Sequence, residues 1–190
     1  MSLNLQEILE TNEALLEGHF LLTSGRHSDR YIEKFRLLEQ PAALDQVAAA
    51  MAEGNPPGSI DVVLGAAIGG ILLAGAVARQ LECRSMFTER VEGKMALRRG
   101  FTLSPDERVL IVEDIVTTGG SVSEILDVVH ESGSDLREVI CLVDRSERGI
   151  DFGVPARALL RLPIASWQPD ECPLCQAGKP LIKPGRSGKK

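Results

Sequence analysis

The stretch from Val109 to Ser121 constrains the fold of this chain more than any other. Its first residues, Val109 to Val112, form a continuous apolar run, which is typical of a strand covered on both faces. Two carboxylates, Glu113 and Asp114, follow where we expect that strand to end. A turn of small and hydroxyl-bearing residues then leads into apolar residues at helical spacing. This order of strand, turn and helix predicts one unit of a parallel α/β sheet.

The turn at Thr117, Thr118, Gly119, Gly120 and Ser121 has the chemistry of an anion site. Backbone N–H groups at a helix N-terminus lack partners within the helix, and the helix dipole favours negative charge there. The glycines allow a close backbone approach, and the hydroxyls add donors. The two acids before the turn repel phosphate, so we expect them to accept hydrogen bonds from sugar hydroxyls or to favour nearby positive charge. On pattern alone, an ordinary strand, turn and capped helix remains the alternative.

Further strands and helices alternate along the chain. We expect helices at 70–81 and from Pro41, strands at 61–64, 85–88, 137–143 and 157–161, a cap made by Asn4 and Glu7, and a helix end at Gly133. This alternation predicts a parallel α/β sheet, which binds ligands beyond the carboxyl ends of its strands. Four loops are predicted at those ends, namely 65–70, 89–100, 113–121 and 144–149.

Composition excludes several classes of partner. The 190 residues suit one domain, or one domain with a small appendage. The net charge of −6 argues against nucleic-acid binding. The stretch Val62 to Ala78 carries no charge, but its glycines favour a strand, a turn and a buried helix over a membrane span. No signal-peptide pattern precedes the four cysteines, so we expect a cytoplasmic protein.

The residues Val112 to Ser121 resemble the signature of the type I phosphoribosyltransferases. In that family two acids hold the ribose hydroxyls of phosphoribosyl pyrophosphate, and the following loop wraps its 5′-phosphate. The resemblance gives the first role to Glu113 and Asp114 and the second to Thr117–Ser121, with Ile115 and Val116 in the same site. It also implies a parallel-sheet core over 39–165, a small N-terminal hood over 1–38, and a C-terminal segment with a flexible basic tail over 166–190.

Two more loops extend this resemblance to the orotate phosphoribosyltransferases. The glycine-rich turn 65–70, with Ile68 and Gly69, matches the family's pyrophosphate turn, although by itself it reads equally as a tight packing turn. The segment 89–100 matches a cationic catalytic loop that reaches the neighbouring subunit, with Arg90 and Lys94 at matching positions. Val91 and Ala96 replace the usual Lys and His, which favours electrostatic stabilisation over proton transfer. A solvated surface loop is the alternative.

A third motif, Asp144 to Gly149, concerns the base. Its Arg145 makes either a simple surface ion pair or a bidentate clamp on a carboxylate. No aromatic residue occurs between Cys141 and Gly149 to stack a purine, so a carboxylated pyrimidine suits the site better. In the resembled enzymes the matching arginine contacts orotate, and we assign Thr117 to the same subsite. The segment 21–31 is similar to their N-terminal orotate-site segment.

The resemblance implies an enzyme of de novo pyrimidine biosynthesis that transfers a phosphoribosyl group to orotate. It implies Mg²⁺ held mainly by the substrate, catalytic roles for Arg90, Lys94 and Asp114, and a homodimer with a shared loop. A phosphoribosyltransferase for another base, such as a purine salvage enzyme, and a non-enzymatic sensor of phosphoribosyl pyrophosphate are the alternatives.

The C-terminal Cys172-Pro-Leu-Cys175 stands apart from these motifs. A zinc site usually needs four ligands, and the sequence shows no second pair, so we predict no metal held by the protein alone. His27 has no obvious partner and reads as a structural or surface histidine rather than a catalytic one. The basic tail Lys179–Lys190 is expected to be disordered.

Overall fold

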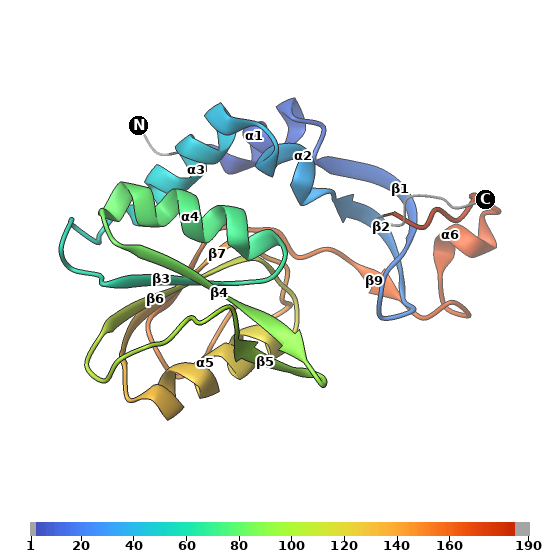
Figure 1. The fold of residues 1–190 in the computed structure, drawn as a ribbon. Helices are drawn as coiled ribbons and strands as arrows, with labels where there is room; N and C mark the ends of the chain where they lie inside the picture. The colour runs from blue at the N-terminus through green and yellow to red at the C-terminus, as the bar shows by residue number, and fades with distance from the viewer. Residues whose placement is uncertain (1–2, 185–190) are drawn as a thin grey trace.

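The computed structural model describes residues 3–184. Its main sheet has six strands in the order β5-β4-β3-β6-β7-β8 (Figure 1). All neighbours pair in parallel except β4 and β5, which are antiparallel. The predicted parallel α/β sheet is therefore confirmed. The strands are β3 (Val62–Ala66), β4 (Arg84–Val91), β5 (Lys94–Leu97), β6 (Arg108–Val116), β7 (Asp135–Asp144) and β8 (Ala156–Arg161).

Helices cover both faces of this sheet. The helices α3 (Pro41–Ala52) and α4 (Gly69–Leu81) lie on one face, and α5 (Gly120–Ser132) lies on the other (Figure 1). Side chains alternate between the faces, so Val109 and Ile111 pack with α5 while Leu110 and Val112 pack with the opposite layer. Because neither face meets water, the strand has no polar positions, which explains the continuous apolar run.

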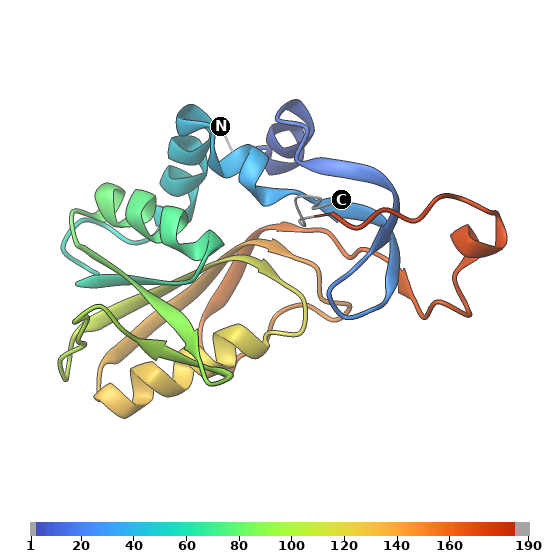
Figure 2. The ribbon, with the colours of Figure 1, turned by 45° about the vertical axis from the view of Figure 1, so that its right-hand side comes forward.

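A smaller sheet joins the two ends of the chain. It has the order β1-β2-β9 and is antiparallel, with β1 at Leu15–Leu21, β2 at His27–Ile32 and β9 at Ser166–Trp167. The short helices α1 (Leu5–Thr11) and α2 (Lys34–Leu38) precede and follow the hairpin, and α6 (Pro173–Gln176) follows β9 (Figure 2). Since β2 lies between β1 and β9, the N-terminal hood and the C-terminal segment share one sheet. The boundaries at 38 and 165 stay a prediction.

The predicted helix signals act as expected. Asn4 Oδ1 accepts a hydrogen bond from the Glu7 N–H at 3.3 Å and caps α1. Pro41 opens α3, and Gly133 ends α5 in the left-handed conformation with φ of 73°. The uncharged stretch 62–78 divides into β3 and most of α4. Within residues 3–184, no helix combines the length and apolar character that crossing a membrane requires.

Three sequence expectations about local structure are wrong. The strand β6 does not end at Val112 but continues to Val116, because its parallel pairing with β7 runs on to Val116 and Asp144. The polar insert after 88 is not an open loop but an antiparallel hairpin, β4–β5. Its two turn residues, Glu92 and Gly93, both have positive φ, of 50° and 89°, as tight hairpin turns require.

The third incorrect expectation concerns the basic C-terminal tail. Residues 179–184 are ordered rather than disordered, because the Leu21 N–H donates to the Ile182 carbonyl and the Ile182 N–H donates to the His19 carbonyl, each at 2.8 Å. These bonds add the tail to the free edge of β1, and they satisfy backbone groups that an edge strand leaves open. The predicted disorder of residues 185–190 lies outside the described part of the chain.

Candidate active site

The four predicted loops meet at one edge of the main sheet. They follow β3, β4, β6 and β7, which are neighbours in the sheet and run in parallel, so that their carboxyl ends coincide. Backbone hydrogen bonds join them: the Ala67 N–H donates to the Thr88 carbonyl, and the Arg145 N–H donates to the Val116 carbonyl, each at 2.8 Å. The sheet therefore gathers the predicted site residues, as expected for a parallel fold.

Glu113 and Asp114 form a buried acidic pair at this edge, with 6% and 4% of each residue exposed. Glu113 Oε1 accepts a hydrogen bond from the Asp114 N–H at 2.9 Å. Burial, followed by the charge of Asp114, raises the pKa of Glu113 to about 8. Glu113 is consequently mostly protonated at neutral pH in the ligand-free protein, while Asp114 forms an ion pair with Lys34 Nζ. The two neighbouring carboxyl groups thus differ in surroundings, because Glu113 has a raised pKa and Asp114 pairs with a lysine.

The predicted anion cradle forms a small hollow of about 60 Å³, lined by Glu113 and by every residue from Ile115 to Val122. Gly119 precedes α5 with φ of 79°, and no side chain caps the helix. The amides of the first turn therefore lack partners inside the helix and are available to an anion. Thr117 and Thr118 are exposed at the mouth of this hollow, so their hydroxyls are accessible to a ligand.

The glycine-rich turn lies directly against the acidic pair. A Cβ atom placed on Gly69 would overlap the Asp114 carboxylate and approach Lys34 Nζ to 3.1 Å. A Cβ atom on Gly65 would overlap the carbonyl group of Gly70. Glycine is therefore required at both positions, because neighbouring atoms lie too close for a Cβ atom. Ile68, the residue before Gly69, is 71% exposed, which is unusual for a large apolar residue.

The β4–β5 hairpin carries its cations away from the acidic pair. Arg90 pairs with Glu124 of α5 at 3.1 Å and also donates to the Gly93 carbonyl. The Met95 N–H donates to Glu124 Oε2 at 2.9 Å, so one carboxylate holds both arms of the hairpin against α5. Lys94 is exposed and makes no ion pair within residues 3–184. The structure of the single chain thus does not bring Arg90 or Lys94 to Glu113 and Asp114.

Arg145 follows β7 and is only partly exposed. Its Nε is buried without a hydrogen-bond partner among the described residues, and burial lowers the pKa of its guanidinium from the ordinary value. The preceding Asp144 does not neutralise it, because Asp144 Oδ1 instead accepts hydrogen bonds from the Ser146 N–H at 2.8 Å and from its hydroxyl at 2.6 Å. A buried guanidinium N–H without a partner is costly, and an anionic ligand is the natural group to satisfy it.

Sequence reasoning missed Lys34, and it placed Tyr31 in the segment 21–31 without giving that residue a role. Lys34 begins α2 and reaches Asp114 across 80 positions of sequence. Tyr31 is half-buried, and its pKa is raised by burial first and then by Glu33, with opposing effects from Lys34 and Arg145. Tyr31 closes the segment that resembles an orotate site, but no spacing rule connects the hood with the acids of β6.

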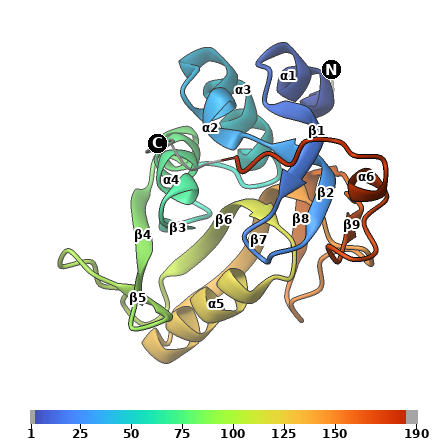
Figure 3. The same ribbon diagram turned by 90° about the vertical axis from the view of Figure 1, so that its right-hand side faces the viewer.

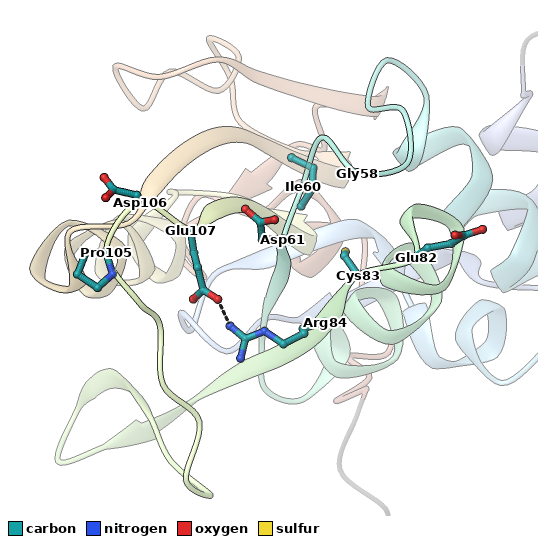
Figure 4. A pocket seen from close by; sticks show the side chains of 9 residues that line it. All are labelled: Gly58, Ile60, Asp61, Glu82, Cys83, Arg84, Pro105, Asp106 and Glu107. Atoms are coloured by element: carbon teal, nitrogen blue, oxygen red, sulfur yellow. Dashed lines mark hydrogen bonds and ion pairs between the residues drawn. The ribbon is translucent and has the colours of Figure 1, made fainter.

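A hollow of about 690 Å³ lies elsewhere, at the amino ends of β3, β4 and β6. Figure 4 shows its lining and the ion pair between Arg84 and Glu107, which are 2.5 Å apart. None of the predicted site residues lines it. Because parallel sheets bind ligands at the opposite edge, we do not include this hollow in the site.

Comparison with known proteins gives consistent matches. Residues 36–152 match the family described as phosphoribosyl transferase domain. The orotate phosphoribosyltransferase of Heliobacterium modesticaldum is 50% identical over 183 residues, covering 94% of this chain and 95% of the relative. The solved orotate phosphoribosyltransferase of Aeropyrum pernix is 28% identical with a TM-score of 0.66, covering 83% and 93%. An adenine phosphoribosyltransferase from Rhodothermus marinus, 20% identical with a TM-score of 0.62 and covering 83% and 99%, shares the fold.

Proposed function

The chain belongs to the phosphoribosyltransferase family, and we propose that it transfers the phosphoribosyl group of phosphoribosyl pyrophosphate to orotate. The products are orotidine 5′-phosphate and pyrophosphate, a step of de novo pyrimidine biosynthesis. The buried, unpartnered Nε of Arg145 is the structural observation that carries the choice of base, because orotate supplies a carboxylate for it. Near-full-length relatives named orotate phosphoribosyltransferase support the same choice.

The acidic pair and the following loop form the sugar-phosphate half of the proposed site. Asp114 and Glu113 accept hydrogen bonds from the ribose hydroxyls, and the negative potential of the Asp114 carboxylate favours the positive charge that develops at the anomeric carbon. The 5′-phosphate binds in the hollow lined by 115–122, where the amides of the first turn of α5 donate to it. Together these contacts fix the sugar between the leaving group and the attacking base.

The leaving pyrophosphate lies over the turn that carries Ile68 and Gly69. The contact of Gly69 with Asp114 places this turn next to the ribose-binding acids, as the transfer requires. Arg90 and Lys94 supply the positive charge that stabilises the departing group. The turn itself carries no charged side chain, so its contribution comes from backbone amides.

Mg²⁺ is the proposed cofactor, held mainly by the substrate. Within residues 3–184, no group of three or more acidic or imidazole ligands surrounds the acidic pair. Mg²⁺ accepts a site of one or two carboxylates completed by water and substrate phosphates, and the residues present fit this pattern. When bound, the ion neutralises the pyrophosphate charge, while the chain's own residues position the ribose and the base.

We propose a homodimer in which the β4–β5 hairpin serves the partner's site. The hairpin's position against α5, away from its own acids, supports this arrangement. Mixing two impaired variants, Lys94→Ala and Asp114→Asn, tests it, because a mixed dimer contains one site with both native residues. After random subunit exchange in an equal mixture, half of the dimers are mixed and each carries one native site, so activity of about a quarter of wild type is expected. No restoration after subunit exchange contradicts the shared hairpin.

Base specificity decides between this proposal and its alternatives. Purified protein with phosphoribosyl pyrophosphate and Mg²⁺ is offered orotate, uracil, adenine, guanine and hypoxanthine, and release of pyrophosphate is followed. We expect release only with orotate. Release with a purine supports a salvage enzyme, and binding of phosphoribosyl pyrophosphate without turnover of any base supports a sensor. The predicted cytoplasmic location stays a prediction.

A further inference from the structure

Four potential metal ligands meet between the hairpin β1–β2 and the C-terminal segment. They are His19 of β1, His27 of β2, and Cys172 and Cys175 at α6. Their ligand atoms all lie within 4.8 Å of one another. Among residues 3–184 no other such group of three or more is found. The cluster is separate from the acidic pair and its loops, and the proposed transfer reaction does not use it.

Four of the six distances between the ligand atoms are close to those of one tetrahedral ion. Zinc binds sulfur at about 2.3 Å and nitrogen at about 2.0–2.1 Å, so a tetrahedral site separates two nitrogens by about 3.3 Å and a nitrogen from a sulfur by about 3.5 Å. His19 Nε2 lies 3.0 Å from His27 Nδ1 and 3.5 and 3.7 Å from the sulfurs of Cys172 and Cys175. His27 Nδ1 lies 3.2 Å from Cys175 Sγ.

A backbone carbonyl sets the tautomer that a metal needs. His19 Nδ1 lies 2.8 Å from the Lys179 carbonyl oxygen, which can only accept, so Nδ1 carries the proton and donates it. The lone pair of His19 Nε2 therefore points to the centre of the cluster. Metal-ligating histidines commonly donate their other N–H in this way, which fixes the orientation of the ring.

Hydrogen bonds alone do not satisfy the cluster. If His27 Nδ1 carries a proton, that N–H and two thiols compete for the single lone pair of His19 Nε2. If it does not, two nitrogen lone pairs face each other at 3.0 Å. A cation at the centre removes the conflict, because each of the four atoms directs a lone pair at it. Cys172, His19 and His27 are buried, with exposed fractions of 0%, 2% and 5%, so water cannot replace the missing partners.

We propose that His19, His27, Cys172 and Cys175 bind one zinc ion in a closed, structural site. Two imidazole and two thiolate ligands are the donors that zinc prefers, and four protein ligands leave no open position for catalysis. Binding releases both thiol protons to solvent as the thiolates form. Cys175 is exposed at the rim and provides the entry path. The ion would join the β1–β2 hairpin to the C-terminal segment (Figure 3).

Metal content of the full chain tests the site directly. Protein expressed with zinc and dialysed against metal-free buffer is analysed by mass spectrometry of its elements, and we expect one zinc per chain. Cys175→Ser, an exposed change that spares the fold, is expected to reduce this at least fivefold. Cys83→Ser and His130→Ala are matched controls outside the cluster and should retain the full zinc content.

Substitution of cobalt for zinc tests whether the bound metal is tetrahedrally coordinated. Replacing zinc by Co²⁺ should give the intense visible bands of a tetrahedral cobalt ion with thiolate ligands, and Cys175→Ser should abolish them. Wild-type protein holding less than about 0.2 metal per chain after reconstitution overturns the proposal. A Cys172–Cys175 disulfide in freshly isolated protein also overturns it, as does unchanged metal content in Cys175→Ser.

The structural role has its own test. Removal of zinc by a chelator is expected to speed proteolytic cleavage within 168–183 about tenfold and to lower the Tm of the wild type, because the metal stabilises only the folded arrangement. Cleavage elsewhere, for example in the Gly54–Gly58 loop, should change little. An unchanged cleavage rate after complete zinc removal overturns the structural role.

Discussion

Glu113→Gln should remove a specific part of the pH dependence of stability. The variant keeps an amide oxygen at the position that accepts the Asp114 N–H, so the local hydrogen bond is preserved while the ionisable group is lost. In the wild type the pKa of Glu113 is raised by burial and by Asp114 to about 8, from an ordinary 4.5. Between these two values the folded chain keeps a proton that the unfolded chain has released.

The sign and magnitude of the effect follow from this difference. The native state binds more protons than the unfolded state between pH 4.5 and 8, so the free energy of unfolding falls as pH rises through that window. With about 1.4 kcal/mol for each pKa unit, Glu113 should remove about 3 kcal/mol of stability between about pH 5.5 and 8. Glu113→Gln should lose about 3 kcal/mol less than the wild type over the same interval.

Urea unfolding at about pH 5.5, 6.5, 7.5 and 8, followed by circular dichroism in ligand-free protein, measures this difference. Contributions of titrating groups that do not contact Glu113 cancel when the variant is subtracted from the wild type. Glu131→Gln, an exposed carboxyl on α5, is the control and should parallel the wild type. If the Glu113→Gln curve also runs parallel to the wild type within about 0.5 kcal/mol, the assignment of a buried, protonated Glu113 is wrong.

Three further predictions concern the proposed site and its turn. Lys94→Ala should lower kcat about 10- to 100-fold while changing KM less than about threefold, because Lys94 stabilises the charge of the departing pyrophosphate. Steady-state kinetics measure this, with Arg137→Ala as the control. An unchanged kcat removes Lys94 from the mechanism. Arg145→Lys should raise the KM for orotate at least about tenfold with little change for phosphoribosyl pyrophosphate, because lysine lacks the planar fork; equal changes for both substrates would refute a base-specific role. Gly65→Ala should lower the free energy of unfolding by about 2–3 kcal/mol, because the new Cβ atom overlaps the Gly70 carbonyl group. Gly75→Ala should raise the free energy of unfolding by about 0.5–1 kcal/mol, because a Cβ atom there has no neighbouring atom within 4 Å. Equal changes of the two variants in urea unfolding would contradict the close contact at Gly65.

Local patterns predicted the core of the fold because they reflect local physics. The run Val109–Val112 has no polar position because both of its faces are covered, and Pro41 and Gly133 mark helix ends through their own backbone preferences. The predicted end of β6 is wrong because the length of a strand depends on the strand with which it pairs. Pairing with β7 carries the ladder to Val116, past two acids that composition alone places in a loop.

Contacts across the chain were beyond the reach of local patterns. The sequence predicts that Glu113 and Asp114 act together with the loop that follows them. It does not predict the ion pair between Asp114 and Lys34, which joins the core to the hood. The sequence analysis finds no second pair for Cys172 and Cys175, because their partners in the fold, His19 and His27, lie about 150 positions away. Three-dimensional proximity, and not motif length, reveals such ligands.

The shared small sheet also orders events during synthesis. Because β2 is the central strand between β1 and β9, the hood keeps an open edge until Ser166 and Trp167 have been made. His19 and His27 likewise wait for Cys172 and Cys175. All six strands of the main sheet have been made once Arg161 is translated, so their pairing can begin earlier. On the ribosome, the hood that carries Tyr31 and Lys34 is therefore translated first, but its small sheet is completed last.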